Sequence, residues 1–240
     1  MNRYWQQMIV PEIGAEGQQR IEAAKVLIIG AGGLGTPVAV YLAAAGVGTI
    51  GIADGDIVAV SNLPRQFLYD EKDTGQSKAR VLAAKLVGQN PGISINVHDE
   101  ILGKENGSRL IASYDVVCDC TDNPVARILI DSICGQLNKP LMYAVVKDWE
   151  GYVTVLHHIK RVSLQDIFSS SSLLEQADMN CSTAGIVNTT CGIAGSIQAC
   201  EALKTILGVP GSLDGGILCF NSLRGIYRVF TLQSPSQNNK

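Results

Sequence analysis

Glycines and a following run of polar residues are the part of this sequence best suited to chemistry. Gly30, Gly32 and Gly35 stand in G-x-G-x-x-G order within "GAGGLG", and Gly33 lies between them. Glycine leaves the backbone bare, so phosphate oxygens can reach the N–H groups and the positive end of a following helix. This motif predicts nucleotide binding, but it does not identify the nucleotide.

The polar residues after this loop distinguish two classes of nucleotide. Asp54, at the end of "TIGIAD", is placed to accept hydrogen bonds from ribose hydroxyls, and with the glycines alone it would favour an NAD-dependent oxidoreductase. Arg65 offers a planar fork for phosphate oxygens, Asn62 adds a neutral donor, and Lys78 begins a helix after "TGQS". These residues favour a triphosphate, although Arg65 and Lys78 could instead be solvated surface charges.

A carboxylate follows a later strand pattern at the position where open α/β sheets bind ligands. Asp122 ends "VVCDCTD" and is suited to hold a magnesium ion on the phosphates. The alternative role for Asp122 is to cap the helix that begins near Pro124. With the cations, it indicates a triphosphate rather than a pyrophosphate bridge.

Strand and helix patterns alternate through the region that must position these residues. Continuous apolar runs such as "KVLIIG" are typical of strands covered on both faces. We expect strands at 25–30, 49–54, 94–100, 115–122 and 140–146, and helices at 36–46, 77–90, 106–114 and 123–138. This order predicts an α/β fold: a Rossmann-like, doubly wound, mostly parallel sheet with helices on both faces, extended by C-terminal antiparallel strands.

We expect a single domain over residues 1–240, divided into five segments. The first is an N-terminal arm, built from a short extended piece and a helix. The helix expected at 183–207 is rich in Ala and Gly, so it can pack closely against the sheet or a second subunit. The segments are the arm (1–24), the nucleotide-binding core (25–157), a mobile crossover loop (161–182), a helix with C-terminal strands at 216–221 and 225–232 (183–232), and a tail (233–240).

Composition excludes several classes of partner and location for the protein. The 240 residues are 46% hydrophobic with a net charge of −3 and no basic run, so we expect no nucleic-acid partner. The longest apolar stretch is broken by Gly46, Gly48 and Gly51, and "MNRYWQQMIV" has no continuous apolar core, so we expect neither a membrane span nor a signal peptide. Seven cysteines without a C-x-x-C pair favour reduced thiols, a cytoplasmic location and no zinc site.

The chain resembles the ThiF/MoeB/HesA family of ubiquitin-activating-enzyme-like adenylyltransferases, and most closely its thiamine branch. The resemblance rests on ordered matches that include "RYWQQ", "GAGGLGTP", "SNLPRQ", "GQSKA", "DCTDNPVAR", "EGYVTVL", "NCSTAGIV" and "GSIQACEALK". It implies that ATP and Mg²⁺ are the cofactors, with Asp122 as the metal ligand. The implied nucleotide-binding residues are Gly30, Gly32, Gly33, Gly35, Asp54, Asp56, Asn62, Arg65, Gln66, Lys78, Asp122 and Asn123, and the implied catalytic residues are Arg65, Lys78, Asp122 and Cys181.

The resemblance also implies a reaction. The C-terminal Gly-Gly carboxylate of a ubiquitin-fold sulfur-carrier protein, such as a ThiS-like carrier of thiamine thiazole biosynthesis, would be adenylated with release of pyrophosphate. Two alternatives stay open: a MoeB-like enzyme that adenylates the small subunit of molybdopterin synthase, and a binding-only relative that scaffolds a ubiquitin-fold protein. Such a carboxylate, with a pKa of about 3.5, is already ionised at neutral pH, so the reaction needs charge neutralisation rather than a general base.

Three details qualify this resemblance. Cys181 matches a cysteine that thiamine-branch members link covalently to the carrier, and the sequence leaves that role open. Typical bacterial members hold zinc with two C-x-x-C pairs that are missing here, and we interpret His157 and His158 as strand-end residues rather than replacement ligands. The family implies a homodimer whose arm arginine reaches the neighbouring ATP, but Gln6 occupies that position, and whether Arg3 replaces it is open.

Overall fold

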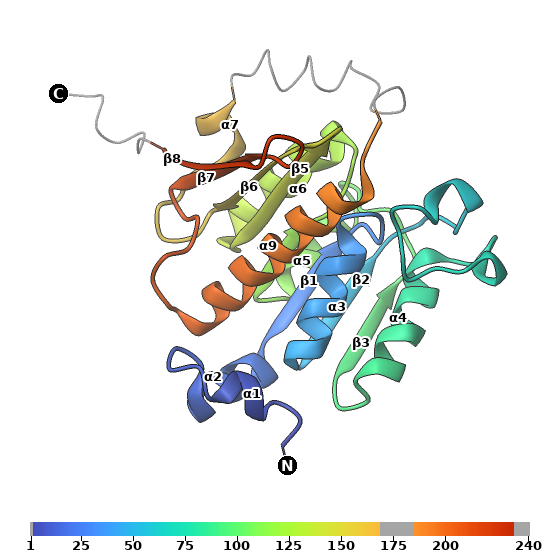
Figure 1. Cartoon of the computed structure of the whole chain (residues 1–240), viewed down its shortest axis with the longest axis horizontal. Coiled ribbons are helices and arrows are strands. Elements are labelled where there is room, and N and C mark those ends of the chain that lie inside the picture. The colour runs from blue at the N-terminus through green and yellow to red at the C-terminus, as the bar shows by residue number, and fades with distance from the viewer. Residues whose placement is uncertain (1, 169–184, 233–240) are drawn as a thin grey trace.

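The computed structural model describes residues 2–168 and 185–232, and within them eight strands form one sheet in the order β3-β2-β1-β4-β5-β6-β7-β8 (Figure 1). The first five are parallel to one another, and β6, β7 and β8 extend the sheet in antiparallel fashion. The strands are β1 (Lys25–Ile29), β2 (Thr49–Ala53), β3 (Ser94–His98), β4 (Val116–Asp119), β5 (Leu141–Lys147), β6 (Glu150–Leu156), β7 (Gly216–Asn221) and β8 (Ile226–Thr231). The predicted fold class is therefore confirmed.

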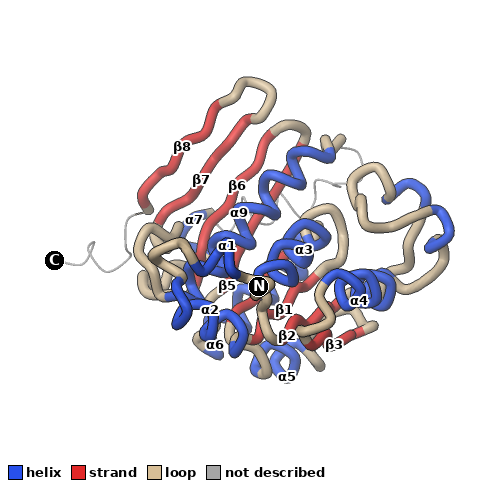
Figure 2. Tube along the Cα trace, turned by 60° about the horizontal axis from the view of Figure 1, so that its bottom comes forward, coloured by secondary structure: helices blue, strands red, loops and turns tan. Residues whose placement is uncertain are grey.

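Helices cover both faces of the sheet, and Figures 1 and 2 show α3, α4 and α9 on one face and α5 and α6 on the other. Each face has its own apolar core, which explains why the central strands are apolar without alternation. The helices are α1 (Trp5–Met8), α2 (Gly14–Ala23), α3 (Gly35–Ala45), α4 (Lys78–Gln89), α5 (Gly107–Ala112), α6 (Pro124–Leu137), α7 (Leu164–Ile167) and α9 (Asn188–Leu207), with 3-10 turns η1 (Val60–Asn62) and η2 (Glu71–Asp73).

The position of β1 in the sheet determines where a ligand can bind. β1 pairs with β2 on one side and with β4 on the other, so the chain runs outward in opposite directions from this strand. The loops after β1 and β4 consequently diverge to opposite faces and leave a crevice at the carboxyl ends of these strands. The glycine loop follows β1, and Asp122 follows β4.

The structure corrects three local expectations. The arm has no extended piece, because residues Trp5–Met8 form a helical turn before α2. The expected crossover loop contains the helical turn α7, where Ser163 and Asp166 form a capping box, and its residues 169–182 lie outside the described residues. The long helix begins at Asn188, because Asp148 hydrogen-bonds the backbone at Gly185 and Val187 and keeps that segment extended.

One glycine of the small-residue helix α9 is required by packing within the chain. A Cβ on Gly195 would lie 2.5 Å from Pro37 Cγ and 2.8 Å from Leu34 O, so this glycine lets α9 approach the start of α3. Of the two packing partners expected from the sequence, α9 contacts the sheet directly through β4, β5 and β6. No helix in the described part of the chain combines the length and apolarity needed to cross a bilayer.

Candidate functional site: a cavity at the carboxyl ends of the parallel strands

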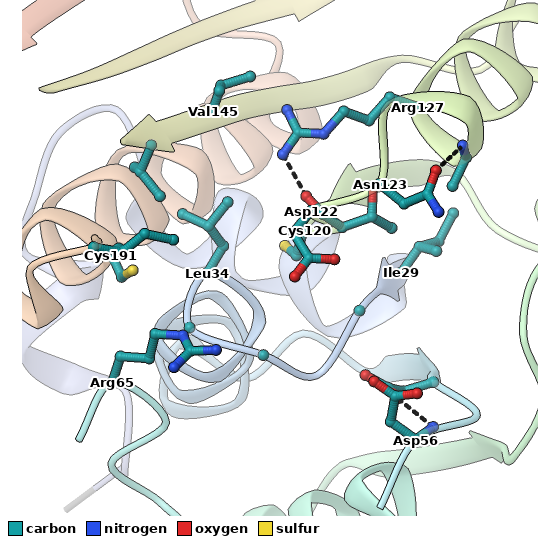
Figure 3. A pocket seen from close by; sticks show the side chains of 18 of the residues that line it. Ile29, Leu34, Asp56, Arg65, Cys120, Asp122, Asn123, Arg127, Val145 and Cys191 are labelled. Atoms are coloured by element: carbon teal, nitrogen blue, oxygen red, sulfur yellow. Dashed lines mark hydrogen bonds between the residues drawn. The ribbon is translucent and has the colours of Figure 1, made fainter. Parts of the chain in front are cut away.

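A cavity of about 1030 Å³ opens at the carboxyl ends of β1, β2, β4 and β5. It is lined by all the predicted nucleotide-binding residues except Gly35. Figure 3 shows Arg65 and Asp122 reaching into it from different walls. Cys181 lies outside the described residues.

The glycines of the loop are required for two different reasons. Gly30 has φ +96°, and a Cβ there would lie 2.7 Å from Cys120 O; a Cβ on Gly35 would lie 1.9 Å from Gly30 O. These two positions need glycine because backbone packs against backbone. A Cβ on Gly32 would meet only Gln66 Nε2 at 3.6 Å, and Gly32 faces the cavity, so there the absence of a side chain leaves room for a ligand.

Asp54 is held rigidly at the end of β2. Its Oδ2 accepts a hydrogen bond from the N–H of Ala31 at 2.7 Å, and its Oδ1 accepts one from the N–H of Asp56 at 2.7 Å. Burial raises the pKa of Asp54, while these two N–H donors oppose the rise. Each oxygen keeps a further lone pair for a hydroxyl donor from a ligand.

Both predicted cations line the cavity. Lys78 is 7% exposed, and its Nζ lies 2.9 Å from Oδ2 of the exposed Asp56. Arg65 is half-buried, and its Nη1 donates to Ser61 O at 3.2 Å. The alternative that Lys78 is an ordinary solvated charge is therefore wrong.

Two of the three predicted amide side chains, Asn62 and Gln66, also line the cavity. Asn62 Oδ1 accepts from the N–H of Ala59 at 3.2 Å, which fixes the turn that carries Arg65. Gln66 is 3% exposed, and within the described residues its Oε1 is buried without a hydrogen-bond partner. A buried oxygen of this kind needs a donor, and a ligand in the cavity is one source.

The start of α6 assigns different positions to Asp122 and Asn123. Asn123 caps the helix, because its Oδ1 accepts from the N–H groups of Val125 at 2.9 Å and Ala126 at 3.2 Å. Asp122 is not the cap; it is exposed to the cavity, and its carboxylate makes no hydrogen bond or ion pair within the described residues. A free carboxylate beside a phosphate-sized space fits Mg²⁺, which proteins often bind through one or two carboxylates plus substrate phosphates.

Arg127 is a cavity residue to which the sequence analysis gave no role. It is 8% exposed, and its guanidinium donates to Thr121 O, to Ala144 O at 3.1 Å and to Tyr143 Oη at 3.3 Å. The signal was present in "DCTDNPVAR", where Arg127 comes one helical turn after the cap Asn123. An arginine on a helix is usually exposed, so the sequence alone gave no reason to place it inside.

Asp119, at the end of β4, was also missed. It is fully buried, and its Oδ1 accepts from the N–H of Thr121 at 2.9 Å and from Thr121 Oγ1 at 2.7 Å. Its Oδ2 has no partner within the described residues. Burial raises the pKa of Asp119, and the charge of Arg127 opposes that rise.

The cavity lining also includes residues from β5, from β6, from the turn between them and from the end of the first described part of the chain. These residues are Val145, Lys147, Asp148, Tyr152 and Phe168. Cys191, the fourth residue of α9, is buried against the glycine loop. Burial raises the pKa of Cys191 to about 11 against the opposing charge of Arg65, so at neutral pH it is a thiol and a poor nucleophile.

The structure shows the contacts of two residues that lie where the chain departs from the family pattern, His157 and Arg3. His157 directly follows β6, as expected of a strand-end residue, and its Nε2 lies 2.7 Å from Asp131 Oδ1. In residues 2–168 and 185–232, no group of three or more His, Cys, Asp and Glu side chains is placed to hold a metal ion. Arg3 Nη1 donates to Gln89 O at 3.1 Å, at the end of α4, so within its own chain this arginine is engaged at the carboxyl end of that helix.

This chain is similar to one protein family and to several known proteins. The ThiF family model matches residues 4–240. A sulfur carrier protein adenylyltransferase of Thermus thermophilus is 36% identical over 237 residues, which cover 97% of this chain and 88% of that protein. A probable molybdopterin-synthase adenylyltransferase of Porphyra purpurea is 36% identical over 245 residues, covering 99% and 64%.

Other relatives are longer than this chain, and the solved structures share its fold at lower sequence identity. The chain spans only 50–58% of the length of several curated relatives called adenylyltransferase and sulfurtransferase. A crystal structure of E. coli MccB with ATP has a TM-score of 0.81 at 24% identity and covers 98% of this chain and 73% of that one. At this identity the likeness establishes the fold.

Proposed function

The chain belongs to the ThiF family, and from this premise we propose that it is an enzyme that uses ATP to adenylate the C-terminal Gly-Gly carboxylate of a ubiquitin-fold sulfur-carrier protein. The products are an acyl-adenylate and pyrophosphate. Relatives named as adenylyltransferases of a sulfur carrier protein and of molybdopterin synthase support this activity.

One observation carries the proposal: the cavity combines phosphate-binding backbone, cations and a free carboxylate. The glycine loop, Arg65 and Lys78 line the same cavity into which Asp122 projects (Figure 3). A nicotinamide enzyme would need an acid or base for hydride transfer and has little use for this set of charges. A triphosphate attacked by a carboxylate needs them, because an anion must approach a polyanion.

The residues then take the following roles. Asp54 accepts from the ribose hydroxyls, the loop N–H groups and the amino end of α3 bind phosphate oxygens, and Arg65 and Lys78 neutralise charge that develops toward the leaving pyrophosphate. Asp122 would hold Mg²⁺, which when bound neutralises further phosphate charge. The incoming carboxylate is already ionised, so no residue has to remove a proton.

The carrier is the less specific part of the proposal. We favour a ThiS-like carrier of the thiamine pathway because of phrases such as "YLAAAGVGT" and "NCSTAGIV". The Porphyra relative supports the small subunit of molybdopterin synthase equally well as a second candidate. A binding-only relative would share the fold and the cavity but would not turn over ATP.

The test is ATP–pyrophosphate exchange with each candidate Gly-Gly carrier. Exchange should occur with one carrier and be lost in Arg65→Ala and Asp122→Ala, while both variants keep the wild-type circular dichroism spectrum. Exchange at near wild-type rate in either folded variant would refute the assignment of that residue. A wild-type protein that binds a carrier but never exchanges pyrophosphate would be the binding-only relative.

Cys181 has a proposed role that rests on the family resemblance. Thiolate attack on the acyl-adenylate would form a covalent link to the carrier and release AMP. Cys181→Ser should spare pyrophosphate exchange and abolish the adduct on a gel. Persistence of the adduct in this variant would exclude Cys181.

The assembly and the location are proposed on the same premise. We propose a homodimer, to be tested by sedimentation equilibrium, in which a single 25.5 kDa species would argue against it. A cytoplasmic location accords with the six described cysteines, none of which forms a disulfide.

A further inference from the structure

The peptide that precedes Asp122 is held from both sides by buried charged residues. On one side, Asp119 Oδ1 accepts from the N–H of Thr121 at 2.9 Å and from its hydroxyl at 2.7 Å. On the other, the Arg127 guanidinium donates to the carbonyl oxygen of Thr121. Every polar group of Thr121 is therefore engaged, and Asp122 is the next residue in the chain.

The two residues that hold Thr121 are themselves fixed. Arg127 also donates to Ala144 O at 3.1 Å, and its Cζ lies 5.3 Å from the centre of the buried Tyr143 ring, so it is anchored on β5. Asp119 lies in β4, and Gln198 of α9 donates to its backbone oxygen at 2.8 Å. The contacts of Arg127 and Asp119 thus connect the end of β4 to β5 and to α9.

This arrangement is costly for stability. Asp119 and Arg127 are 0% and 8% exposed, and Asp119 Oδ2 has no partner in the described part of the chain. Buried charges are often no more stabilising than apolar residues of similar size. A role in orienting a neighbouring group explains why two buried ionisable side chains stand directly beside Asp122, a cavity carboxylate whose oxygens are free among the described residues.

We propose that Asp119 and Arg127 are positioning residues that fix the Thr121 peptide and thereby aim the Asp122 carboxylate at the metal–phosphate group. This inference rests on the proposed function, because it takes Asp122 as the metal ligand. Groups that orient a metal ligand typically change metal affinity by about 10–100-fold when they are removed.

The experiment measures ATP binding by calorimetry over a Mg²⁺ titration, without any carrier protein. In Arg127→Met, the Thr121 carbonyl loses its donor, so the Mg²⁺ concentration that gives half of the full ATP affinity should rise by about tenfold. The affinity for ATP without Mg²⁺ should stay at the wild-type value. Arg127→Lys and Asp119→Asn, which keep one hydrogen-bonding group each, should give smaller increases.

Asp131→Asn is the matched control. Asp131 is a buried carboxylate one turn further along α6, and it accepts from Leu164 N and contacts His157. Its substitution should lower the melting temperature without changing the Mg²⁺ requirement. If Arg127→Met does not fold, Arg127→Lys and Asp119→Asn carry the comparison.

The outcomes separate this inference from the proposed function. A wild-type Mg²⁺ requirement in the folded Arg127 variants, or an equal loss of affinity with and without Mg²⁺, would overturn it; the second result would mean that Arg127 contacts the nucleotide directly. ATP binding by the wild type that ignores Mg²⁺ would also overturn it. If the Mg²⁺ requirement shifts as expected but no carrier supports pyrophosphate exchange, the inference stands and the proposed function fails.

Discussion

At the scale of single residues, the glycine motif combines two requirements that look identical in the sequence. Gly35 lets the backbone of α3 pass Gly30 O, where a Cβ would lie at 1.9 Å. Gly32 has space around it and faces the cavity. The first requirement belongs to folding and the second to ligand binding.

Alanine substitution should separate these two requirements. Gly35→Ala must displace backbone and should cost about 3 kcal/mol of unfolding free energy or more, whereas Gly32→Ala should cost less than about 1 kcal/mol. Gly32→Ala should instead lose the stabilisation that ATP confers, because a methyl group occupies space needed by the phosphates. Urea unfolding with and without ATP measures both effects; equal costs for the two variants would contradict the distinction.

The buried thiol of Cys191 makes a pH-dependent contribution to stability. Burial raises its folded-state pKa from 9.0 to about 11, so the folded protein holds this proton more tightly than the unfolded chain. The contribution is fully present below about pH 9 and is lost as the pH rises toward about 11. Between about pH 8 and about pH 10, the wild type should therefore lose about 1.4 kcal/mol more unfolding free energy than Cys191→Ala. Urea unfolding curves at the two pH values measure this, and equal losses would show that the thiol is not perturbed.

At the scale of elements, the junction between β4 and α6 places a structural residue and a site residue next to each other. Asn123 satisfies the first N–H groups of α6, and this leaves the carboxylate of Asp122 free to face the cavity. A strand that ends at a parallel sheet's carboxyl edge and turns into a helix commonly provides both roles.

Single substitutions of these two residues should have opposite effects: one should lower stability, and the other should remove ligand binding. Asn123→Ala should lower the unfolding free energy by about 1 kcal/mol through loss of the cap. Asp122→Asn should change it by less than about 0.5 kcal/mol, since the side chain is exposed, and should remove Mg²⁺-dependent ATP binding. Chemical unfolding and calorimetry on both variants test this, and a large loss of stability in Asp122→Asn would show that it is a structural residue.

At the scale of the whole molecule, the cavity exists because the order in which the chain adds strands to the sheet reverses at β1. No single segment supplies it: residues from the ends of β1, β2, β4 and β5, from the loop around Arg65 and from α9 all line it. Ligand binding should therefore stabilise the entire fold rather than one loop.

The lining of the whole cavity predicts that the protein binds ATP with Mg²⁺ rather than NAD. ATP with Mg²⁺ at about 100 times its dissociation constant should raise the unfolding free energy by about 2.7 kcal/mol, and NAD at the same concentration should not. Thermal melts compare the two ligands directly. Stabilisation by NAD alone would favour the oxidoreductase that the glycine motif and Asp54 also allow.

Metal content gives a second prediction for the whole chain. Because the two C-x-x-C pairs are missing, elemental analysis of the purified protein should find no stoichiometric zinc, and a chelator should leave the melting temperature unchanged. One zinc per chain would contradict this prediction.

The sequence alone determined the fold class and the polar residues of the cavity around the glycine loop, because these depend on local patterns. Apolar runs, helix caps and glycine spacing are set within a few residues, and they located the ends of the strands where Asp54 and Asp122 lie. Only the tertiary structure brought Asp119 and Arg127 together around Thr121, assigned the cap to Asn123 rather than Asp122, and buried Lys78 and Cys191. These features depend on which strands are neighbours and on which helix face meets them, and such long-range contacts are not written in any short stretch of the chain.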